Sequence, residues 1–393
     1  MSTTRDRTAR APRRLLVVSD EMEIGGSQSQ IVHLLSGLDR SAWQPELLYF
    51  RKHSFLVDQL EAAGIRTHHL PKNGRVDFGF VRRLYAFLRS GRYELVHAFS
   101  LTAELWVRAL LPLLAPTKFV ASVRGLCLGY PAWQWWLKRW IAHRADAIVA
   151  NAHAGARMTA LRATVPLDCI SVIPNGVEIP VLLDAVARAR GRADLGVPEN
   201  RVFGLFVGRL VSEKNLPLLL DALARLPSTS RPLLLLAGDG PLRAQLVEQA
   251  RSLQLDTDLR LLGERRDAQA LMQLADFLVL PSREEGLSNV LLEAMAAGCA
   301  VIASDVGGNP EIVEHEVNGL LFTSDNADQL ARALAALTSD VASRTRLGSA
   351  ARRHAASMHG ITALIDATAS LYIRVLDEPR RKRCMNTTGA HGG

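Results

Sequence analysis

Two glutamates flank a predicted helix N-terminus in the stretch REEGLSNVLLEAM, which begins at Arg283. Ser288 and Asn289 are preferred N-cap residues, Glu285 precedes them, and Glu293 follows about one turn into the helix. A helix N-terminus presents N–H groups that have no partner within the helix, and it attracts phosphate. Carboxylates accept hydrogen bonds from hydroxyl groups. The combination predicts a pocket for a ligand with both phosphates and hydroxyls, which favours a nucleotide sugar over free phosphate.

A second group of candidate residues follows an apolar run at 202–207. Gly208 permits a ligand to approach the backbone closely, and Arg209 and Lys214 come after it. Arginine offers a planar fork of donors and lysine offers a point charge, and both suit a diphosphate. Either residue alone is more often a surface cation, but the pair at a strand end favours phosphate binding. Gly263, in the strand-end loop GERRD, is predicted to lie beside the base or the ribose.

Gly25 and Gly26 form a third candidate group, in the first half of the chain. They follow an apolar run at 15–18 and precede a predicted helix at 28–38. A strand, a glycine turn and a helix again present N–H groups to an anion. The alternative is a tight turn that needs two glycines for its shape alone. The motif is not GxGxxG, so a dinucleotide cofactor is not predicted.

Predicted strands and helices alternate along the whole chain. Apolar runs of strand length occur at 15–18, 46–50, 65–70, 95–98, 119–123, 147–150 and 170–173, and then at 202–207, 233–237, 259–262, 277–280, 300–303 and 320–322. This alternation predicts an α/β protein with doubly wound parallel sheets, whose ligands bind at the carboxyl ends of the strands. All three candidate groups fall in loops of that kind.

The chain of 393 residues is long enough for roughly two to three domains. We expect a first domain at 15–178, a linker at 179–200 and a second domain at 201–360. A helix at about 361–376 is predicted to pack back across the first domain. The basic tail 1–14 and the tail 379–393 are predicted to be disordered.

The net charge of +8 favours anionic substrates or an anionic membrane surface, beside the alternative of ordinary arginine-rich solvated faces. No basic run is interleaved with exposed aromatic residues on a recognisable nucleic-acid-binding module, so nucleic acid is not an expected partner. The four cysteines have no paired spacing, which indicates a reducing compartment and no metal cluster. The apolar run near the N-terminus is too short for a signal peptide, and the segment 101–123 is interrupted by charges and prolines. We therefore expect a cytoplasmic protein.

A tryptophan-rich helix is predicted at 133–143. Trp133, Trp136 and Trp140 share one face of it by their spacing, and several basic residues accompany them. Such a stripe most often belongs to the core. The functional alternative is an amphipathic surface that meets the membrane interface or a lipid-linked acceptor. That alternative extends the expected location to the inner face of the plasma membrane.

Taken together, these motifs resemble those of the retaining glycosyltransferases of family 4. The resemblance rests on Gly208-Arg209 with Lys214-Asn215, on Gly238-Asp-Gly-Pro241, on the E-x7-E spacing of Glu285 and Glu293, and on the run ASDVGGNPE at 303–311. In the first half of the chain, Gly25-Gly26, the strand end VHA at 96–98 and PNGV at 174–177 match as well. The resemblance covers nearly the whole chain apart from both tails.

The resemblance implies a GT-B fold, in which two Rossmann-like doubly wound domains face each other across a cleft. It implies that the second domain holds the nucleotide-sugar donor, that the first holds the acceptor, and that no metal or other cofactor is needed. The implied donor is a UDP- or GDP-sugar. The implied acceptor is a glycan or a lipid-linked glycan in cell-envelope or exopolysaccharide biosynthesis.

The resemblance also implies a role for each candidate residue. Arg209 and Lys214 neutralise the diphosphate leaving group, Glu293 binds the ribose hydroxyls, and Glu285 binds the hydroxyls of the transferred sugar. The donor site is completed by the backbone of Gly25, Gly26, Gly208, Gly263, Gly286, Leu287, Ser288, Asn289 and Val290. Hydroxyl binding by the glutamates favours a front-face transfer, in which the leaving phosphate helps to deprotonate the acceptor, over a nucleophile and acid pair.

Two positions depart from the family pattern. Many relatives have a histidine before a glycine at the edge of the fifth strand, where this chain has Arg124 before Gly125. Arginine cannot act as a base at neutral pH, but it stabilises a phosphate or an anionic acceptor, so Arg124 is a candidate on the catalytic and acceptor side. Phe99 stands where relatives often show another histidine, and His97 is interpreted as a satisfied supporting residue in preference to a catalyst.

Two alternatives to a glycosyltransferase stay open at this point. A nucleotide-sugar epimerase on a similar scaffold would need further acid and base groups that face the sugar, and none is evident at 281–322. A GT-B protein that binds nucleotide sugar without turnover is motivated only by Arg124. The intact set of Arg209, Lys214, Glu285 and Glu293 favours an enzyme of the hexosyltransferase type.

Overall fold

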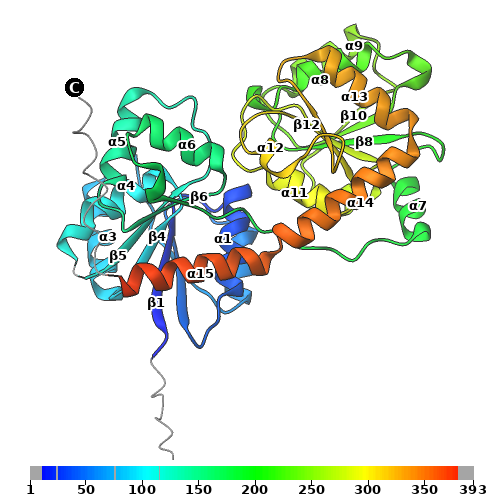
Figure 1. Ribbon diagram of the computed structural model, residues 1–393. Helices are drawn as coiled ribbons and strands as arrows, with labels where there is room; N and C mark the ends of the chain where they lie inside the picture. Colours follow the sequence, from blue (N-terminus) through cyan, green and yellow to red (C-terminus); the bar gives the residue numbers. More distant parts are fainter. Residues whose placement is uncertain (1–10, 24, 75–76, 115, 379–393) are drawn as a thin grey trace, which may run out of the picture.

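The computed structural model describes residues 11–23, 25–74, 77–114 and 116–378. The predicted tail 379–393 and most of the tail 1–14 lie outside these residues. The described chain forms two parallel sheets, each with helices on its faces, in two domains that lie side by side (Figure 1). This confirms the predicted α/β class with two Rossmann-like doubly wound domains.

The sheet of the first domain has seven strands in the order β3-β2-β1-β4-β5-β6-β7. Their bounds are β1 Arg13–Ser19, β2 Trp43–Tyr49, β3 Arg66–His69, β4 Leu95–Ala98, β5 Lys118–Val123, β6 Ala147–Ala150 and β7 Ile170–Val172. Residues 15–18 of β1 are fully buried, as expected of a parallel strand covered on both faces. The strand begins earlier than predicted, because Arg13 and Arg14 pair with β2, so these two residues belong to the sheet and not to a tail.

Six helices connect these strands. They are α1 Gly26–Gly37, α2 Phe55–Ala62, α3 Phe78–Gly91, α4 Leu101–Leu110, α5 Ala132–Ala142 and α6 His153–Arg162. Side-chain caps explain where several of them begin, since Ser54, Asp77 and Ser100 each accept a hydrogen bond from a backbone N–H in the first turn that follows.

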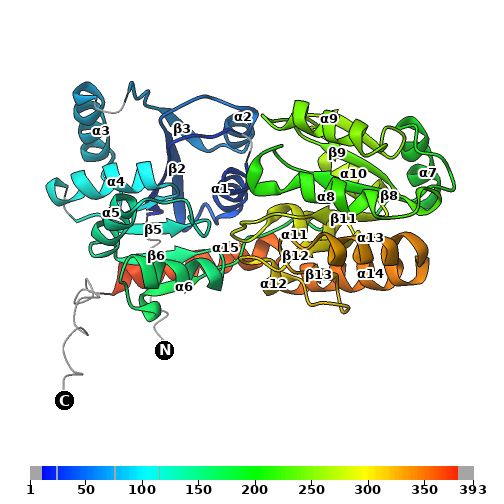
Figure 2. The same cartoon turned by 90° about the horizontal axis from the view of Figure 1, so that it is seen from above.

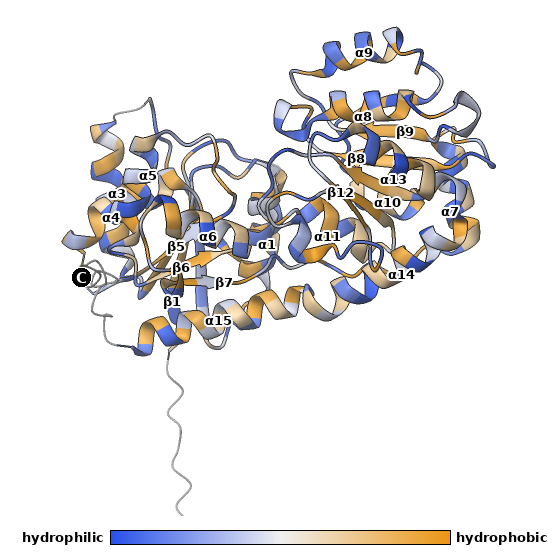
Figure 3. Cartoon of the chain, turned by 45° about the horizontal axis from the view of Figure 1, so that its top comes forward, coloured by the Kyte–Doolittle hydropathy of each residue, from blue (hydrophilic) through white to orange (hydrophobic). Residues whose placement is uncertain are grey.

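The sheet of the second domain has six strands in the order β10-β9-β8-β11-β12-β13. Their bounds are β8 Phe203–Val207, β9 Leu233–Ala237, β10 Leu259–Gly263, β11 Phe277–Leu280, β12 Ala300–Ser304 and β13 Leu320–Phe322. The helices are α8 Leu216–Ala224, α9 Arg243–Ser252, α10 Ala268–Leu274, α11 Asn289–Ala296, α12 Asn309–Ile312, α13 Ala327–Ser339 and α14 Val341–Met358. Apolar residues concentrate on the strands and on the inner faces of the helices, while the outer faces are polar (Figure 3).

The strand order reverses once in each sheet. The reversal falls between β1 and β4 in the first sheet and between β8 and β11 in the second. Ligands of open α/β sheets bind at such switch points, beyond the carboxyl ends of the strands. The glycine turn after β1, the cations after β8 and Glu285 after β11 all follow these strands, so the topology brings the three candidate groups to the two switch points.

The predicted linker at 179–200 requires a correction. It contains helix α7 (Ala185–Asp194), which packs against α10 of the second domain. Arg188 and Arg192 each reach a different carboxylate oxygen of Asp276 at 3.0 Å. The apolar pattern gives no signal for this helix, because none of its residues is fully buried and ion pairs attach it to the domain.

Helix α15 (Ile361–Asp377) leaves the second domain and lies along the first (Figures 1 and 2). Tyr372 is fully buried there, and its ring meets that of Trp43 edge-on at a centroid distance of 5.6 Å. The two segments that link the domains run together, since the N–H of Val177 donates to the carbonyl of His359 at 2.7 Å. The first domain is therefore completed by the end of the chain.

Candidate active site

The loop after β11 leads into helix α11, whose N-terminus faces the first domain. The side chain of Ser288 is buried and accepts a hydrogen bond from the N–H of Leu291 at 3.4 Å. The first turn of α11 contains no acidic residue, so its positive end is not neutralised from within the helix. The predicted donor residues 286–290 all lie in this segment, where backbone N–H groups are available to an anion.

Lys214 and Glu285 lie in contact at the carboxyl ends of the neighbouring strands β8 and β11. The Nζ atom of Lys214 is 2.5 Å from Oε1 of Glu285, and the Ser282 hydroxyl donates to the same oxygen at 2.6 Å. Both side chains are largely withdrawn from solvent, with exposed fractions of 21% and 11%. The ion pair fixes a cation and a carboxylate beside the N-terminus of α11.

Arg209 is exposed and has no side-chain hydrogen bond or ion pair with any described residue. Hydrogen bonds to the backbone and to Ser212 lower the pKa of Glu213 in the same loop, and the charge of Arg209 adds a smaller contribution in the same direction. Gly208 before it has a φ of +153°, which a side chain would strain. Gly263 ends β10, which is separated from β8 by β9, and it lies at the same carboxyl-terminal edge of the sheet. Its carbonyl accepts the N–H of Gly238 at 2.7 Å.

Glu293 has an unusual environment on α11. Burial raises the pKa of its carboxyl from 4.5 to about 7, and no described residue donates a hydrogen bond or a positive charge to it. A buried carboxylate without a partner is costly, so such groups are normally paired. The side chain nevertheless keeps some exposure to solvent, so its carboxyl is not sealed within the core.

Gly25 and Gly26 bring a second helix N-terminus to the same place. Helix α1 begins at Gly26 and has no acidic residue in its first turn. The side chain of Asn289, the first residue of α11, donates to the carbonyl of Gly26 at 2.7 Å. A Cβ on Gly26 would lie 2.6 Å from Nδ2 of Asn289, so glycine is required by this close approach. The starts of α1 and α11 therefore converge across the domain boundary.

Asn175, which belongs to the PNGV motif, and Gln30, which the sequence did not single out, connect the first domain to the start of α11. Asn175 donates to the carbonyl of Leu287 at 3.1 Å and to Oδ1 of Asn289 at 2.7 Å. Gln30 receives the N–H of Gly176 at 2.8 Å and donates back to its carbonyl at 2.9 Å. These contacts join residues more than a hundred positions apart, so no local sequence signal could reveal them.

Glu311 makes a further contact between the domains. Its carboxylate accepts the N–H groups of His153 and Ala154, at 2.7 Å each, and so caps helix α6 of the first domain from α12 of the second. A carboxylate at a helix N-terminus is electrostatically favourable. The two walls of the cleft are therefore in contact at this point.

A cavity of about 530 Å³ opens on the first-domain side of the cleft. Its walls carry hydroxyl, amide, aromatic and charged groups from the loops after β1, β4 and β5 and from α5, together with Glu284 of the second domain. Hydroxyls, amides and aromatic faces are the groups that bind sugars. The cavity lies against the donor loop, because a Cβ on Gly286 would be 2.7 Å from the carbonyl oxygen of Arg124.

Arg124 lines this cavity. Its guanidinium lies 4.2 Å from the centroid of the Phe99 ring, and its Nη1 donates to Oδ1 of Asn175 at 3.4 Å. Burial lowers the pKa of Arg124 to about 10, so the group stays cationic at neutral pH and does not serve as a base. Its Nε atom is buried without a hydrogen-bond partner among the described residues.

His97 lies behind this cavity and not in its wall. The ring is buried, with Nδ1 2.6 Å from the Tyr372 hydroxyl and Nε2 2.8 Å from the Ser122 hydroxyl. Burial, and secondarily the charge of Arg124, holds the pKa of His97 well below its usual value, so the ring is neutral. It connects α15 to β5 and supports the residues next to Arg124.

The structure places the three tryptophans that were assigned to the acceptor side in different environments. Trp133 and Trp136 are 59% and 64% exposed, whereas Trp140 packs with its ring 4.0 Å from the guanidinium of Arg108. None of the three lines the cavity, and Trp135 does. The spacing did not predict these different environments, because packing decides which side of α5 meets the sheet.

A buried ion pair that the sequence did not suggest supports the floor of the cavity. Lys138 of α5 reaches both carboxylate oxygens of Glu104, at 2.8 and 2.6 Å, and donates to the carbonyl of Ser122 at 2.8 Å. Glu104 in turn accepts the N–H of Ser122 at 2.9 Å. The pair fixes α4 and α5 to the end of β5, just before Arg124.

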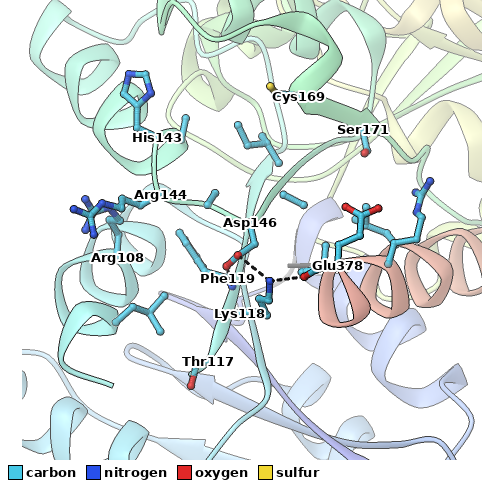
Figure 4. A pocket seen from close by; sticks show the side chains of 18 of the residues that line it. Arg108, Thr117, Lys118, Phe119, His143, Arg144, Asp146, Cys169, Ser171 and Glu378 are labelled. Carbon is cyan, nitrogen blue, oxygen red and sulfur yellow. Dashed lines mark hydrogen bonds and ion pairs between the residues drawn. The ribbon is translucent and has the colours of Figure 1, made fainter. Parts of the chain in front are cut away.

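A second cavity, of about 360 Å³, lies at the opposite edge of the first sheet (Figure 4). Lys118 bridges its floor, at 3.4 Å from Asp146 and 3.0 Å from the carbonyl of Glu378. Strands β5 and β6 begin here, so the cavity faces away from the donor loops. It is separate from the candidate active site.

Two further searches concern only the part of the chain that the structure describes. There, no three or more histidine, cysteine, aspartate and glutamate side chains are grouped as metal ligands would be. In the same ranges, no helix combines the length and apolar character needed to cross a bilayer.

The fold and this site define a class of two-domain enzymes that bind a nucleotide sugar in the cleft, and comparison with known proteins identifies the family. The model for "Glycosyltransferase Family 4" matches residues 24–179, and that for "Glycosyl transferases group 1" matches residues 187–354. A D-inositol 3-phosphate glycosyltransferase of Saccharomonospora viridis is 31% identical over 298 residues, 70% of this chain and 69% of that one. The putative glycosyltransferase EpsF of Bacillus subtilis is 29% identical over 305 residues, 75% of this chain and 79% of that one.

Solved structures agree in fold. The crystal structure of Anabaena Alr3699/HepE in complex with UDP superposes with a TM-score of 0.82 at 22% identity, over 92% of this chain and 99% of that one. The sucrose-phosphate synthase of Thermosynechococcus elongatus gives a TM-score of 0.76 at 20% identity, over 92% and 99%. This chain belongs to glycosyltransferase family 4, the glycosyl transferases group 1, and has the GT-B fold. The expected enzyme class, a glycosyltransferase, is thereby confirmed.

Proposed function

We propose that this glycosyltransferase transfers a sugar from a UDP- or GDP-sugar, held by the second domain, to an acceptor in the first-domain cavity. The observation that carries the proposal is the convergence of two helix N-termini with Arg209 and the Lys214–Glu285 pair at the two switch points. These groups suit a diphosphate, because they combine N–H donors with positive charge that needs no rearrangement.

The proposed chemistry places the residues in distinct roles. As the bond from the sugar to the diphosphate breaks, Arg209, Lys214 and the N–H groups of α11 stabilise the departing charge. Glu293 accepts hydrogen bonds from the ribose hydroxyls, which supply the partners that its carboxylate lacks within the described protein. Glu285, oriented by Lys214 and Ser282, binds hydroxyls of the transferred sugar.

We propose that the reaction retains the anomeric configuration and requires no metal. Glu285 is engaged by a lysine and a serine, which fits a hydroxyl-binding role better than that of a nucleophile. The leaving phosphate then accepts the proton of the acceptor hydroxyl on the same face of the sugar. Proton NMR of the freshly formed product determines the anomeric configuration, and an inverted product contradicts retention. Turnover in excess EDTA tests the metal requirement: it is expected to be undiminished, and its loss contradicts metal independence.

The proposed acceptor is a glycan or a lipid-linked glycan of the cell envelope or of an exopolysaccharide, at the inner face of the plasma membrane. The hydroxyl, amide and aromatic residues that line the cavity support a saccharide acceptor. The membrane contact is supported by Trp133 and Trp136, exposed on α5, and by Leu128, 48% exposed in the loop before it.

Vesicle sedimentation tests the membrane contact. The full-length protein is expected to sediment with anionic vesicles at low salt, and a variant with Trp133→Ser and Trp136→Ser is expected to remain in solution. Equal recovery of both proteins in the supernatant contradicts the contact.

A panel of nucleotide sugars tests the donor assignment. UDP- and GDP-linked glucose, galactose, mannose and N-acetylglucosamine are incubated with the protein, and binding and slow hydrolysis are measured. One nucleotide is expected to bind and its sugar to be released, with the activity lost in Lys214→Ala. Absence of binding to every member contradicts the donor assignment.

A further inference from the structure

The first-domain cavity contains a cation that the protein does not neutralise. Beneath the cavity, the charge of Glu104 is used by Lys138, which reaches it at 2.6 Å. Arg124, which follows the end of β5, is the second cation of the cavity wall. Of the two cations, Lys138 pairs with Glu104, whereas the guanidinium of Arg124 has no ion-pair partner among the described residues.

The hydrogen bonding of Arg124 is incomplete as well. Its one hydrogen bond to a described side chain is the 3.4 Å contact to Asn175, and its Nε atom is buried without a partner. Arginine carries five N–H donors in a fixed fork. Buried charges are normally paired and hydrogen bonded, because leaving them unpaired is costly. An arginine in this state at the wall of an open cavity is arranged for a ligand that brings the missing charge.

The carboxylates of the cavity do not supply that charge. Asp20, Glu21 and Glu284 line it, but none forms an ion pair with Arg124. Glu284 accepts the N–H of Leu128 at 3.1 Å, and Glu21 lies 4.0 Å from Arg51. The acidic residues thus belong to other parts of the wall.

The groups around Arg124 indicate what carries the anion. The residues that line the cavity include the hydroxyl-bearing Ser100 and Thr102 and the aromatic Tyr130 and Trp135. Hydroxyls exchange hydrogen bonds with sugar hydroxyls, and aromatic faces cover the apolar faces of sugar rings. The ligand chemistry is therefore that of a saccharide with one oxyanion.

The donor diphosphate has proposed partners other than Arg124. The groups proposed to bind it lie on the loops after β8 and β11 and at the starts of α1 and α11. The guanidinium of Arg124 is held over Phe99, which is itself part of the cavity wall in the first domain. Its Nη1 also donates to Asn175, whose side chain contacts Leu287 and Asn289 at the start of α11, so titration with UDP alone is needed to separate a sugar oxyanion from the diphosphate.

We propose that the cavity binds a sugar that carries a phosphate or a carboxylate, and that Arg124 forms the ion pair with that oxyanion. The inference rests on the proposed function, since it specifies the sugar that occupies the acceptor side of the same site. The oxyanion comes either from the acceptor or from the transferred sugar, and the chemistry at Arg124 is the same for both.

Calorimetric titration of the full-length protein with matched pairs of ligands tests the proposal. The affinities for glucose, glucose 6-phosphate and glucuronate are compared on the protein saturated with UDP. A preference for the charged sugars in this comparison assigns the oxyanion to the acceptor. The affinities for UDP-glucose and UDP-glucuronate are compared on the free protein. A preference for UDP-glucuronate assigns the oxyanion to the transferred sugar. The charged member of at least one pair is expected to bind about 10- to 100-fold more tightly than the neutral one, the range for hydrogen bonds to charged groups.

Variants assign the preference to its residue. Arg124→Gln is expected to reduce the charged-to-neutral ratio to nearly one, while Arg157→Gln, at an exposed arginine of α6 in the same domain, keeps it. Titration with UDP alone monitors the fold of each variant.

The outcomes are distinct. Equal affinities within every pair, or no binding of any sugar to a protein that binds UDP, overturn the proposal. It is also overturned if Arg124→Gln weakens UDP itself by as much as it weakens the charged sugar, because the oxyanion is then the diphosphate. Failure of the wild-type protein to bind any nucleotide refutes the proposed function instead.

Discussion

Replacing Glu293 by glutamine is expected to stabilise the protein at alkaline pH while weakening its hold on the donor. Burial raises the pKa of this carboxyl from 4.5 to about 7. When the pKa of a carboxyl is higher in the folded state than in the unfolded state, the free energy of unfolding begins to fall as the pH rises past the pKa of the unfolded state. The full loss of stability is present once the pH is above the pKa of the folded state. For this shift the cost at pH 8 is about 3 kcal/mol, and at pH 5 it is less than about 1 kcal/mol.

Urea unfolding of the full-length protein, followed by tryptophan fluorescence at pH 5 and pH 8, measures this difference. Glu293→Gln is expected to raise the free energy of unfolding by up to about 3 kcal/mol at pH 8 and by much less at pH 5. The control is Glu248→Gln, whose carboxylate on α9 is 72% exposed and which should change little at either pH. A gain that is equal at both pH values, or absent at pH 8, refutes the account of this carboxyl.

The same carboxyl should control the pH dependence of donor binding. At pH 5.5 only about 3% of a group with a pKa near 7 is ionised, so the affinity for the nucleotide should fall about 30-fold from pH 8 if the ribose requires the carboxylate. In Glu293→Gln this pH-dependent fall in nucleotide affinity is expected to disappear. The diphosphate itself also titrates, but this affects wild type and variant equally and cancels in the comparison. Identical pH profiles for wild type and variant would contradict the ribose role.

Three further changes probe the rest of the site. Arg209→Ala and Lys214→Ala should each lower kcat/KM by about 10²- to 10³-fold, the cost of a lost donor to a developing anion, and near-normal steady-state rates in both would sink the diphosphate assignment. Glu285→Gln should lower turnover more than nucleotide affinity; the reverse ranking, from kinetics and calorimetry, would exchange its role with that of Glu293. Lys138→Met should lower the free energy of unfolding by about 3–5 kcal/mol because it leaves Glu104 buried and unpaired, and the double variant with Glu104→Leu should recover most of it. A double variant as unstable as the single one would show that the ion pair does not govern this region.

The parts of the fold that the sequence predicts well are those set by local rules. Continuous apolar runs specify buried parallel strands, and the strands at 95–98, 147–150, 233–237, 277–280 and 320–322 have the predicted bounds. The cap residue Ser288 specifies where α11 begins, whereas α1 begins at Gly26, two residues before its predicted start. Because parallel strands end at one edge, the candidate donor residues could be assigned to one crevice without any contact being known.

The remaining features depend on packing between distant segments. The hydroxyl of Tyr372 fixes His97 across 275 positions, and Asn175 reaches Asn289 across 114. The orientation of α5 likewise depends on which side meets the sheet, so the sequence grouped Trp133 with Trp140 and missed Trp135. Helix α7 was missed because its attachment is ionic and leaves no apolar period.

The most direct test of the donor clamp compares nucleotides that differ only in phosphate. Calorimetry measures UDP, UMP and uridine, or the guanosine series if the panel selects it, on wild type and on Lys214→Ala. The account predicts that wild type binds the diphosphate far more tightly than the nucleoside, and that the variant loses this preference while its affinity for the nucleoside changes little. A diphosphate preference of the same size in Lys214→Ala would contradict a donor held between Arg209, Lys214 and the N-terminus of α11.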